Sequence, residues 1–111
     1  MNLAELKKKG AVVVETLVKK EVQWTHSDPK GKKVTDKFTV HVRRHTYGKM
    51  EVLFASDDPE KSRNASYLSE TILLGPKGDE PLPYEDAMNL DPELGWALMK
   101  AVNEVNHPAK S

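Results

Sequence analysis

The first half of the chain carries two segments in which apolar and polar residues alternate. In residues 18–25 and again in residues 34–42, apolar side chains fall on one side of an extended strand and most of those between them are charged or polar. Residues 27–31 contain Asp-Pro and Gly, which are typical of a turn. The pattern predicts a β-hairpin over residues 18–45 with one apolar face and one basic face. The apolar positions are Val18, Val22, Trp24, Val34, Phe38, Val40 and Val42.

An N-terminal arm over residues 1–17 is expected to precede the hairpin. Residues 3–9 suit one or two helical turns, which a glycine ends. The β-branched run that follows, with Val12, Val13 and Val14, is expected to be extended. An extended arm can add a strand to a neighbouring chain, so these three valines are candidates for self-association.

After Thr46 the apolar period changes from two residues to 3.6, which indicates a helical region over residues 46–106. An Asp-Pro-Glu motif occurs at residues 58–60 and again at 91–93. In each, the Asp is expected to cap a helix whose first position is the Pro. The expected helices cover residues 47–54, 58–74, 83–90 and 92–106.

These elements together predict a mostly helical α+β fold. An N-terminal arm and a β-hairpin are followed by three or four helices in a single domain over residues 1–111, and residues 107–111 form a tail. A chain of 111 residues has the usual length for one hydrophobic core.

Both longer helices have apolar side chains on two sides. Trp96 and Met99 point away from the main apolar face of the last helix, and Tyr67 and Leu74 do so on the earlier one. Two interpretations stay open. Either each helix is covered on both sides within the domain, or these four residues bind a partner, because Trp, Tyr and Met are enriched at the cores of interfaces.

The charge is zero overall but divided between the halves of the chain. Residues 1–50 carry twelve bases and five acids (12 − 5 = +7), and residues 51–111 carry five bases and twelve acids (5 − 12 = −7). Opposite halves can pair within one chain or attract copies head to tail. The basic candidates for such self-association are Lys32, Lys33, Arg43 and Arg44.

Side chains that could perform chemistry are sparse. His41 and His45 share a strand face but lie roughly 13 Å apart at strand spacing, too far for one metal ion, so they are expected at the surface of the hairpin. Asp57, Asp58 and Glu60 are better explained as helix-start residues than as metal ligands. We therefore expect no cofactor, no metal and no enzymatic activity. With no cysteine, no apolar run that could span a membrane and no signal peptide, the chain is expected in the cytoplasm.

The last third of the chain resembles the C-terminal signature of tail assembly chaperones from long-tailed, siphovirus-type bacteriophages and prophages. The similar stretches are PYEDA (83–87), LDPEL (90–94), AL (97–98) and AVNEVN (101–106), and the opening MNLAELKKKG (1–10) is similar to the start of that family. The order of a basic hairpin, the stretch YLSETILLG (67–75) and a polar loop agrees as well.

The resemblance implies a protein that binds the tape measure protein, keeps it soluble until tail tube subunits polymerise around it, and self-associates. It implies the host cytoplasm as location and absence from the mature virion. Further implied partners are the tail tube protein and a longer product made by ribosomal frameshifting. Two other functions remain open: a small nucleic-acid-binding regulator that uses the basic hairpin, and a structural tail or connector component.

Overall fold

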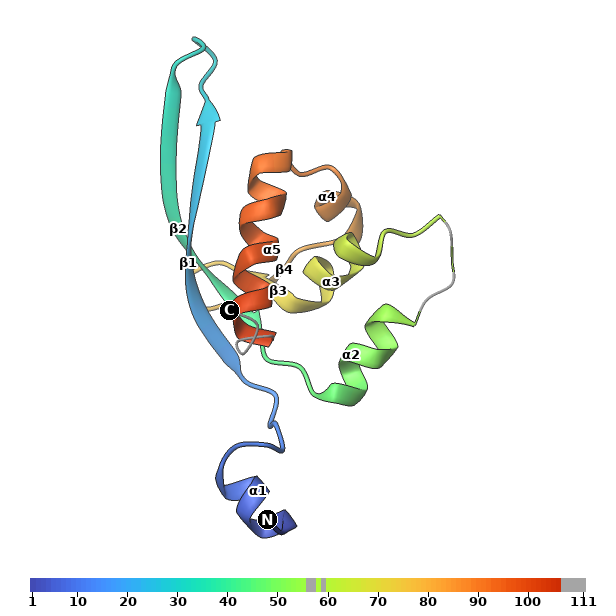
Figure 1. The fold of residues 1–111 in the computed structure, drawn as a ribbon. Helices are drawn as coiled ribbons and strands as arrows, with labels where there is room; N and C mark the ends of the chain where they lie inside the picture. Colours follow the sequence, from blue (N-terminus) through green and yellow to red (C-terminus); the bar gives the residue numbers. More distant parts are fainter. Residues whose placement is uncertain (56–57, 59, 107–111) are drawn as a thin grey trace.

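The computed structural model describes residues 1–55, 58 and 60–106 (Figure 1). Asp57, Pro59 and the tail over residues 107–111 lie outside the described residues, and so do the expectations that fall on them. Helices take up 42% and strands 26% of the described part. The α+β class is therefore confirmed, whereas a mostly helical chain is not.

The predicted β-hairpin is confirmed. Strand β1 (Leu17–Ser27) pairs antiparallel with β2 (Lys33–Arg43) along its whole length. The turn between them is stabilised by the Asp28 carboxylate, which accepts the backbone N–H groups of Lys30 and Lys32, each at 2.9 Å. Gly31 adopts a φ of +82° in this turn, a conformation that favours glycine.

Two short strands extend the sheet beyond the prediction. β3 (Ile72–Leu74) pairs with β2, and β4 (Glu80–Pro81) pairs with β3, so the sheet has the order β1-β2-β3-β4. The prediction of a helix that continues to Leu74 is wrong, because α3 (Arg63–Thr71) ends one residue before β3 begins. Ile72 is extended and fully buried opposite Val42, where its backbone pairs with β2 and its β-branched side chain packs in the core.

The remaining helices agree with the expected order. α2 (Tyr47–Phe54), α4 (Tyr84–Met88) and α5 (Pro92–Asn106) lie where the sequence predicts them. α3, however, begins after Ser62 and not at the Asp-Pro-Glu motif before it. The reason is the cap, since the Ser62 hydroxyl accepts the backbone N–H of Ala65 at 3.1 Å.

α5 lies across one face of the hairpin, and α3 lies on the other side of α5, near α2 and α4 (Figure 1). The amide of Asn106 fixes the end of α5 to the end of β2: its Oδ1 accepts the backbone N–H of His45 at 2.7 Å, and its Nδ2 donates to the carbonyl of Arg43 at 3.1 Å. The core fills the space between sheet and helices. Its largest fully buried side chains are Tyr67, Ile72, Val40, Val42, Val102 and Thr71.

The expectation that His41 and His45 lie at the surface is wrong, since each is only 6% exposed. His41 points to the sheet face opposite α5, but the turn between β3 and β4 covers that face, and a Cβ atom at Gly78 would lie 2.5 Å from the His41 Cγ. The ring of His45 is hydrogen-bonded to the hydroxyl of Thr71 at 2.8 Å. Burial lowers the pKa of His45 below its usual value, so the neutral ring is favoured at this position.

Two parts of the chain project from this body. The helix α1 (Leu3–Lys8) contains no buried residue and lies at one end, while the hairpin turn lies at the other (Figure 1). The radius of gyration is 16.0 Å, compared with about 13 Å for a compact domain of similar length. The longest dimension is 60 Å, about twice the other two of 32 and 28 Å. The projecting arm and hairpin are therefore available for contacts outside the chain.

Candidate protein-interaction sites

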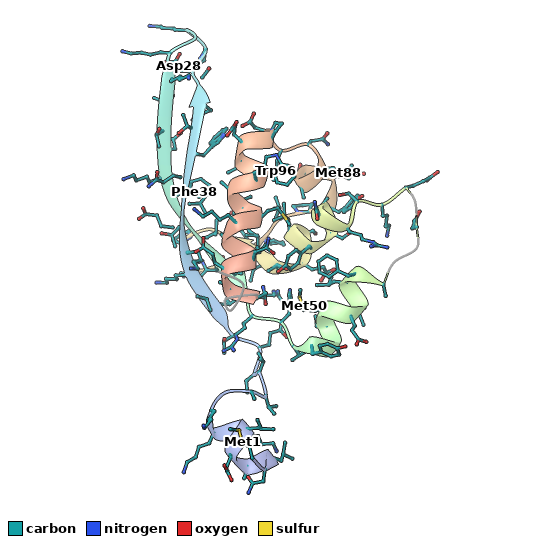
Figure 2. All side chains as sticks on the ribbon, viewed as in Figure 1. Met1, Asp28, Phe38, Met50, Met88 and Trp96 are labelled. Carbon is teal, nitrogen blue, oxygen red and sulfur yellow. The ribbon has the colours of Figure 1, made fainter. Side chains whose placement is uncertain are left out.

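The last helix has a buried side and an exposed apolar side. Leu98, Val102 and Val105 are buried against the sheet and α3, whereas Trp96 is 66% exposed. Met88, on α4, is 50% exposed, and Figure 2 shows it beside Trp96. Large apolar side chains left this open are typical of protein-binding surfaces when they adjoin a groove.

Such a groove lies between α3, α4 and α5 and has a volume of about 210 Å³. Its apolar lining comes from all three helices, and we call it the tryptophan groove. Trp96 and the half-buried Met99 lie on α5, Met88 lies on α4, and Ala65 and Leu68 lie on α3. The groove therefore combines two of the four predicted partner-binding residues, Trp96 and Met99. It also contains Met88, which the sequence reasoning missed. α4 has only five residues, too few for a helical period to single out Met88.

The other two predicted residues lie elsewhere. Tyr67 is 1% exposed, its hydroxyl donates to the carbonyl of Val102 at 3.4 Å, and its ring meets that of Phe54 edge-on at a centroid distance of 5.1 Å. Burial also raises the pKa of its phenol. For Tyr67 the structure thus favours the first interpretation, a helix covered on both sides within the domain, because α2 packs on that side of α3. Leu74 lies on β3, half-buried against the core.

Acidic residues are frequent in the part of the sequence that contains α4 and the start of α5. Between Lys77 and Lys100 the sequence has six acids and no base. Two of these acids, Glu85 and Asp86, lie in the first turn of α4, and Glu93 lies in the first turn of α5. Two of the three helices that form the groove therefore begin with acids, whereas the residues that line the groove itself are uncharged.

The basic self-association candidates fall into two places. Lys32 and Lys33 are exposed in and next to the hairpin turn, at one end of the molecule. Arg43 and Arg44 lie at the opposite end of β2, beside the arm. There the Arg43 guanidinium pairs with the Glu15 carboxylate at 3.2 Å, and the Arg44 N–H donates to the carbonyl of Thr16 at 2.9 Å. Of these four residues, only Lys32 and Lys33 therefore lie at a distance from the arm of their own chain.

The three valines of the arm are largely unburied. Val12 is 51% exposed, Val14 is 77% exposed and Val13 is half-buried. Their segment, which bends at Val12, belongs to no strand of the sheet. The arm thus offers exposed β-branched side chains next to the start of β1.

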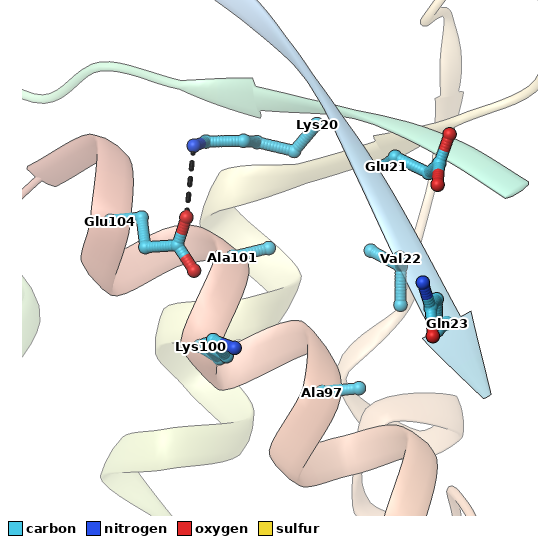
Figure 3. A pocket seen from close by; sticks show the side chains of 8 residues that line it. All are labelled: Lys20, Glu21, Val22, Gln23, Ala97, Lys100, Ala101 and Glu104. Carbon is cyan, nitrogen blue, oxygen red and sulfur yellow. Dashed lines mark hydrogen bonds and ion pairs between the residues drawn. The ribbon is translucent and has the colours of Figure 1, made fainter. Parts of the chain in front are cut away.

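A second groove runs between β1 and α5 (Figure 3). It has a volume of about 300 Å³, and Val22, Ala97 and Ala101 contribute its apolar lining. An ion pair between Lys20 on β1 and Glu104 on α5, at 3.0 Å, joins its two walls. We call this the edge groove, because β1 is the outermost strand of the sheet.

No group of three or more His, Asp or Glu side chains suited to a metal ion occurs within residues 1–55, 58 and 60–106. None of the helices in that part has the length and apolar composition of a membrane span. A further hollow of about 630 Å³, lined by residues that include Trp24, Lys33 and Glu93, lies where the upper part of the hairpin faces the start of α5. The two grooves, this hollow and the arm are described features that suit contacts with other molecules.

Comparison with known protein families identifies the family of the chain. The family model of the phage tail assembly chaperones (TAC) matches residues 4–106, so the chain belongs to this family. The resemblance noted in the sequence is thereby confirmed over nearly its whole length, and the family suggests a non-catalytic role in tail assembly with protein partners. No curated protein and no solved structure matches the chain.

Proposed function

We propose that the chain binds the tape measure protein of its phage and keeps it soluble during tail assembly, in the host cytoplasm, and that it is absent from the finished virion. Family membership supports a chaperone of tail assembly. The tryptophan groove supports the kind of contact. A long helical client needs a surface that binds many similar apolar segments weakly.

The observation that carries this proposal is the exposure of Trp96 above an apolar groove. A helix laid into such a groove inserts side chains spaced three or four residues apart, and Trp is a residue type that dominates such contacts. Met88 and Met99 add unbranched, adaptable side chains, which suit a surface that accepts varied sequences. The acids at the starts of α4 and α5 favour client segments with basic residues beside the apolar ones.

Self-association is the second part of the proposal. Lys32 and Lys33 project at the hairpin turn, whereas acids lie at the starts of α4 and α5, so a contact between copies that pairs these charges joins unlike surfaces. Unlike surfaces repeat from copy to copy and form rings or open spirals. The valines of the arm supply an apolar contact of the same kind.

The test is to co-express the cognate tape measure protein with the chain and to measure how much of it stays in the soluble fraction. Trp96→Ala should lower that fraction severalfold, because the groove loses its largest apolar side chain. Tyr47→Ala is the matched control, since Tyr47 is an aromatic residue that is 80% exposed on α2 and does not line the groove. Equal solubility with both variants, or no effect of the wild-type chain, would overturn the proposal.

A further inference from the structure

β1 presents a long unpaired edge. It has 11 residues and, among the described residues, it pairs with β2 alone. The backbone N–H and C=O groups that point away from β2 are therefore free to pair with another chain. Native proteins usually shorten or cover such an edge, because it is a template for strand addition.

The edge groove gives this edge a defined floor (Figure 3). A strand added beside β1 would lie over α5, and every second side chain would point at Ala97 and Ala101. These alanines leave room for branched apolar side chains, and Val22 continues the apolar lining. Lys100 also lines the groove, and its ammonium group can pair with a carboxylate of the incoming strand.

The N-terminal arm has properties that suit a strand added to the β1 edge. Residues 11–16 contain three consecutive β-branched residues and belong to no strand of the sheet in their own chain. Val12 and Val14 would share one side of an added strand, and both are more than half exposed.

The arm cannot readily use the edge of its own chain. It runs directly into β1, so pairing with its own β1 would need a reversal within residues 15–18. That stretch is Glu-Thr-Leu-Val and lacks the Gly, Pro, Asn or Asp that tight turns use. In addition, Leu17 and Val18 are already paired with β2.

We propose that residues 11–16 of one copy add a strand to the β1 edge of a second copy, with Val12 and Val14 in the edge groove. The inference rests on the self-association proposed above and adds to it a contact between the arm and the β1 edge. Each copy has one arm and one edge, so the contact is head to tail and can repeat.

Disulfide trapping tests the contact directly, because the natural chain has no cysteine. In the full chain, the double variant Val14→Cys/Ala97→Cys should form covalent trimers and larger species under mild oxidation. Each single variant alone can form no species above a dimer. The positional control is Val14→Cys/Lys32→Cys, with the second cysteine at the hairpin turn, and it should give no such ladder. A double variant that stays monomeric or stops at the dimer would overturn the proposal.

A second measurement does not depend on placing sulfur atoms. Val13→Pro removes a backbone N–H from the arm and is poorly tolerated in a paired strand, whereas Val13→Thr keeps the N–H and the β-branch. Light scattering should give Val13→Pro the monomer mass of 12.5 kDa and Val13→Thr the wild-type oligomer mass. Circular dichroism should be unchanged in both, because the arm lies outside the core. Equal masses for the two variants would refute the arm contact.

The arm and the client proposal can fail separately. If the arm contact is wrong, the masses agree and Trp96→Ala still lowers the solubility of the tape measure protein. If client binding is wrong, that solubility does not respond, while Val13→Pro still lowers the mass.

Discussion

Gly78 offers a sharp test of how the sheet face opposite α5 is covered. Its φ is +66°, and a Cβ atom there would lie 2.5, 2.7 and 2.8 Å from three atoms of the His41 ring. The ring is buried and cannot swing into solvent. Gly78→Ala therefore combines a left-handed backbone cost of about 1–2 kcal/mol with an overpacking cost of about 1–3 kcal/mol.

Gly31→Ala is the matched control. Gly31 has a similar φ of +82°, but no atom lies within 4 Å of its added Cβ. Gly31→Ala therefore has only the backbone cost. Part of that cost is offset because alanine lowers the conformational entropy of the unfolded chain, which stabilises the folded protein by about 0.4–1 kcal/mol. The free energy of unfolding should thus fall by about 1–3 kcal/mol more in Gly78→Ala than in Gly31→Ala, the part that comes from overpacking.

Urea unfolding followed by circular dichroism measures both values, and a double variant isolates the contact. In a His41→Ala background the ring is gone, so Gly78→Ala should cost no more than Gly31→Ala does. Equal destabilisation by the two single variants, or an unchanged cost in the His41→Ala background, would refute the close packing of the β3–β4 turn on His41.

Three further predictions use other parts of the structure. Trp96→Ala should lower the free energy of unfolding by only about 1–2 kcal/mol, since a third of the side chain is buried, whereas Tyr67→Ala should lower it by about 3–5 kcal/mol; equal losses in urea unfolding would make Trp96 a core residue. Lys32→Glu/Lys33→Glu should reduce the oligomer mass in light scattering most at low salt, and an unchanged mass would remove the charge contribution. Because burial lowers the pKa of His45, this residue takes up a proton in the unfolded chain before it does so in the folded one as the pH falls below about 6.5. The contribution of His45 to the free energy of unfolding is therefore fully present above that pH and declines below it. His45→Gln should flatten this decline in thermal melts, and an identical slope would contradict it.

The elements that the sequence predicted correctly are those with local signals. The hairpin turn depends on Asp28 and Gly31, which contact only neighbouring residues. α4 and α5 begin at proline-containing starts whose geometry is set within one turn. A single sequence carries such information in full.

The errors arise where distant segments compete. Ile72 fits a helical pattern and a strand equally well, and the choice is made by Val42, thirty residues earlier. A helical period likewise indicates that α3 and α5 each have two apolar sides, but not that α2 covers Tyr67 while Trp96 stays open. His41 was assigned to a solvent face for the same reason, since the turn that covers it comes from the other half of the chain.

The position of the arm outside the core also affects how an assembly of copies would dissociate. No residue of α1 is buried, and none of Val12, Val13 and Val14 belongs to the core cluster. Detaching an arm therefore exposes no core, and a coat joined through such arms comes apart between chains that remain folded. The lifetime of the coat is then set by the off-rate of one short strand and not by an unfolding barrier. Copies can leave one at a time, at the pace of whatever displaces them.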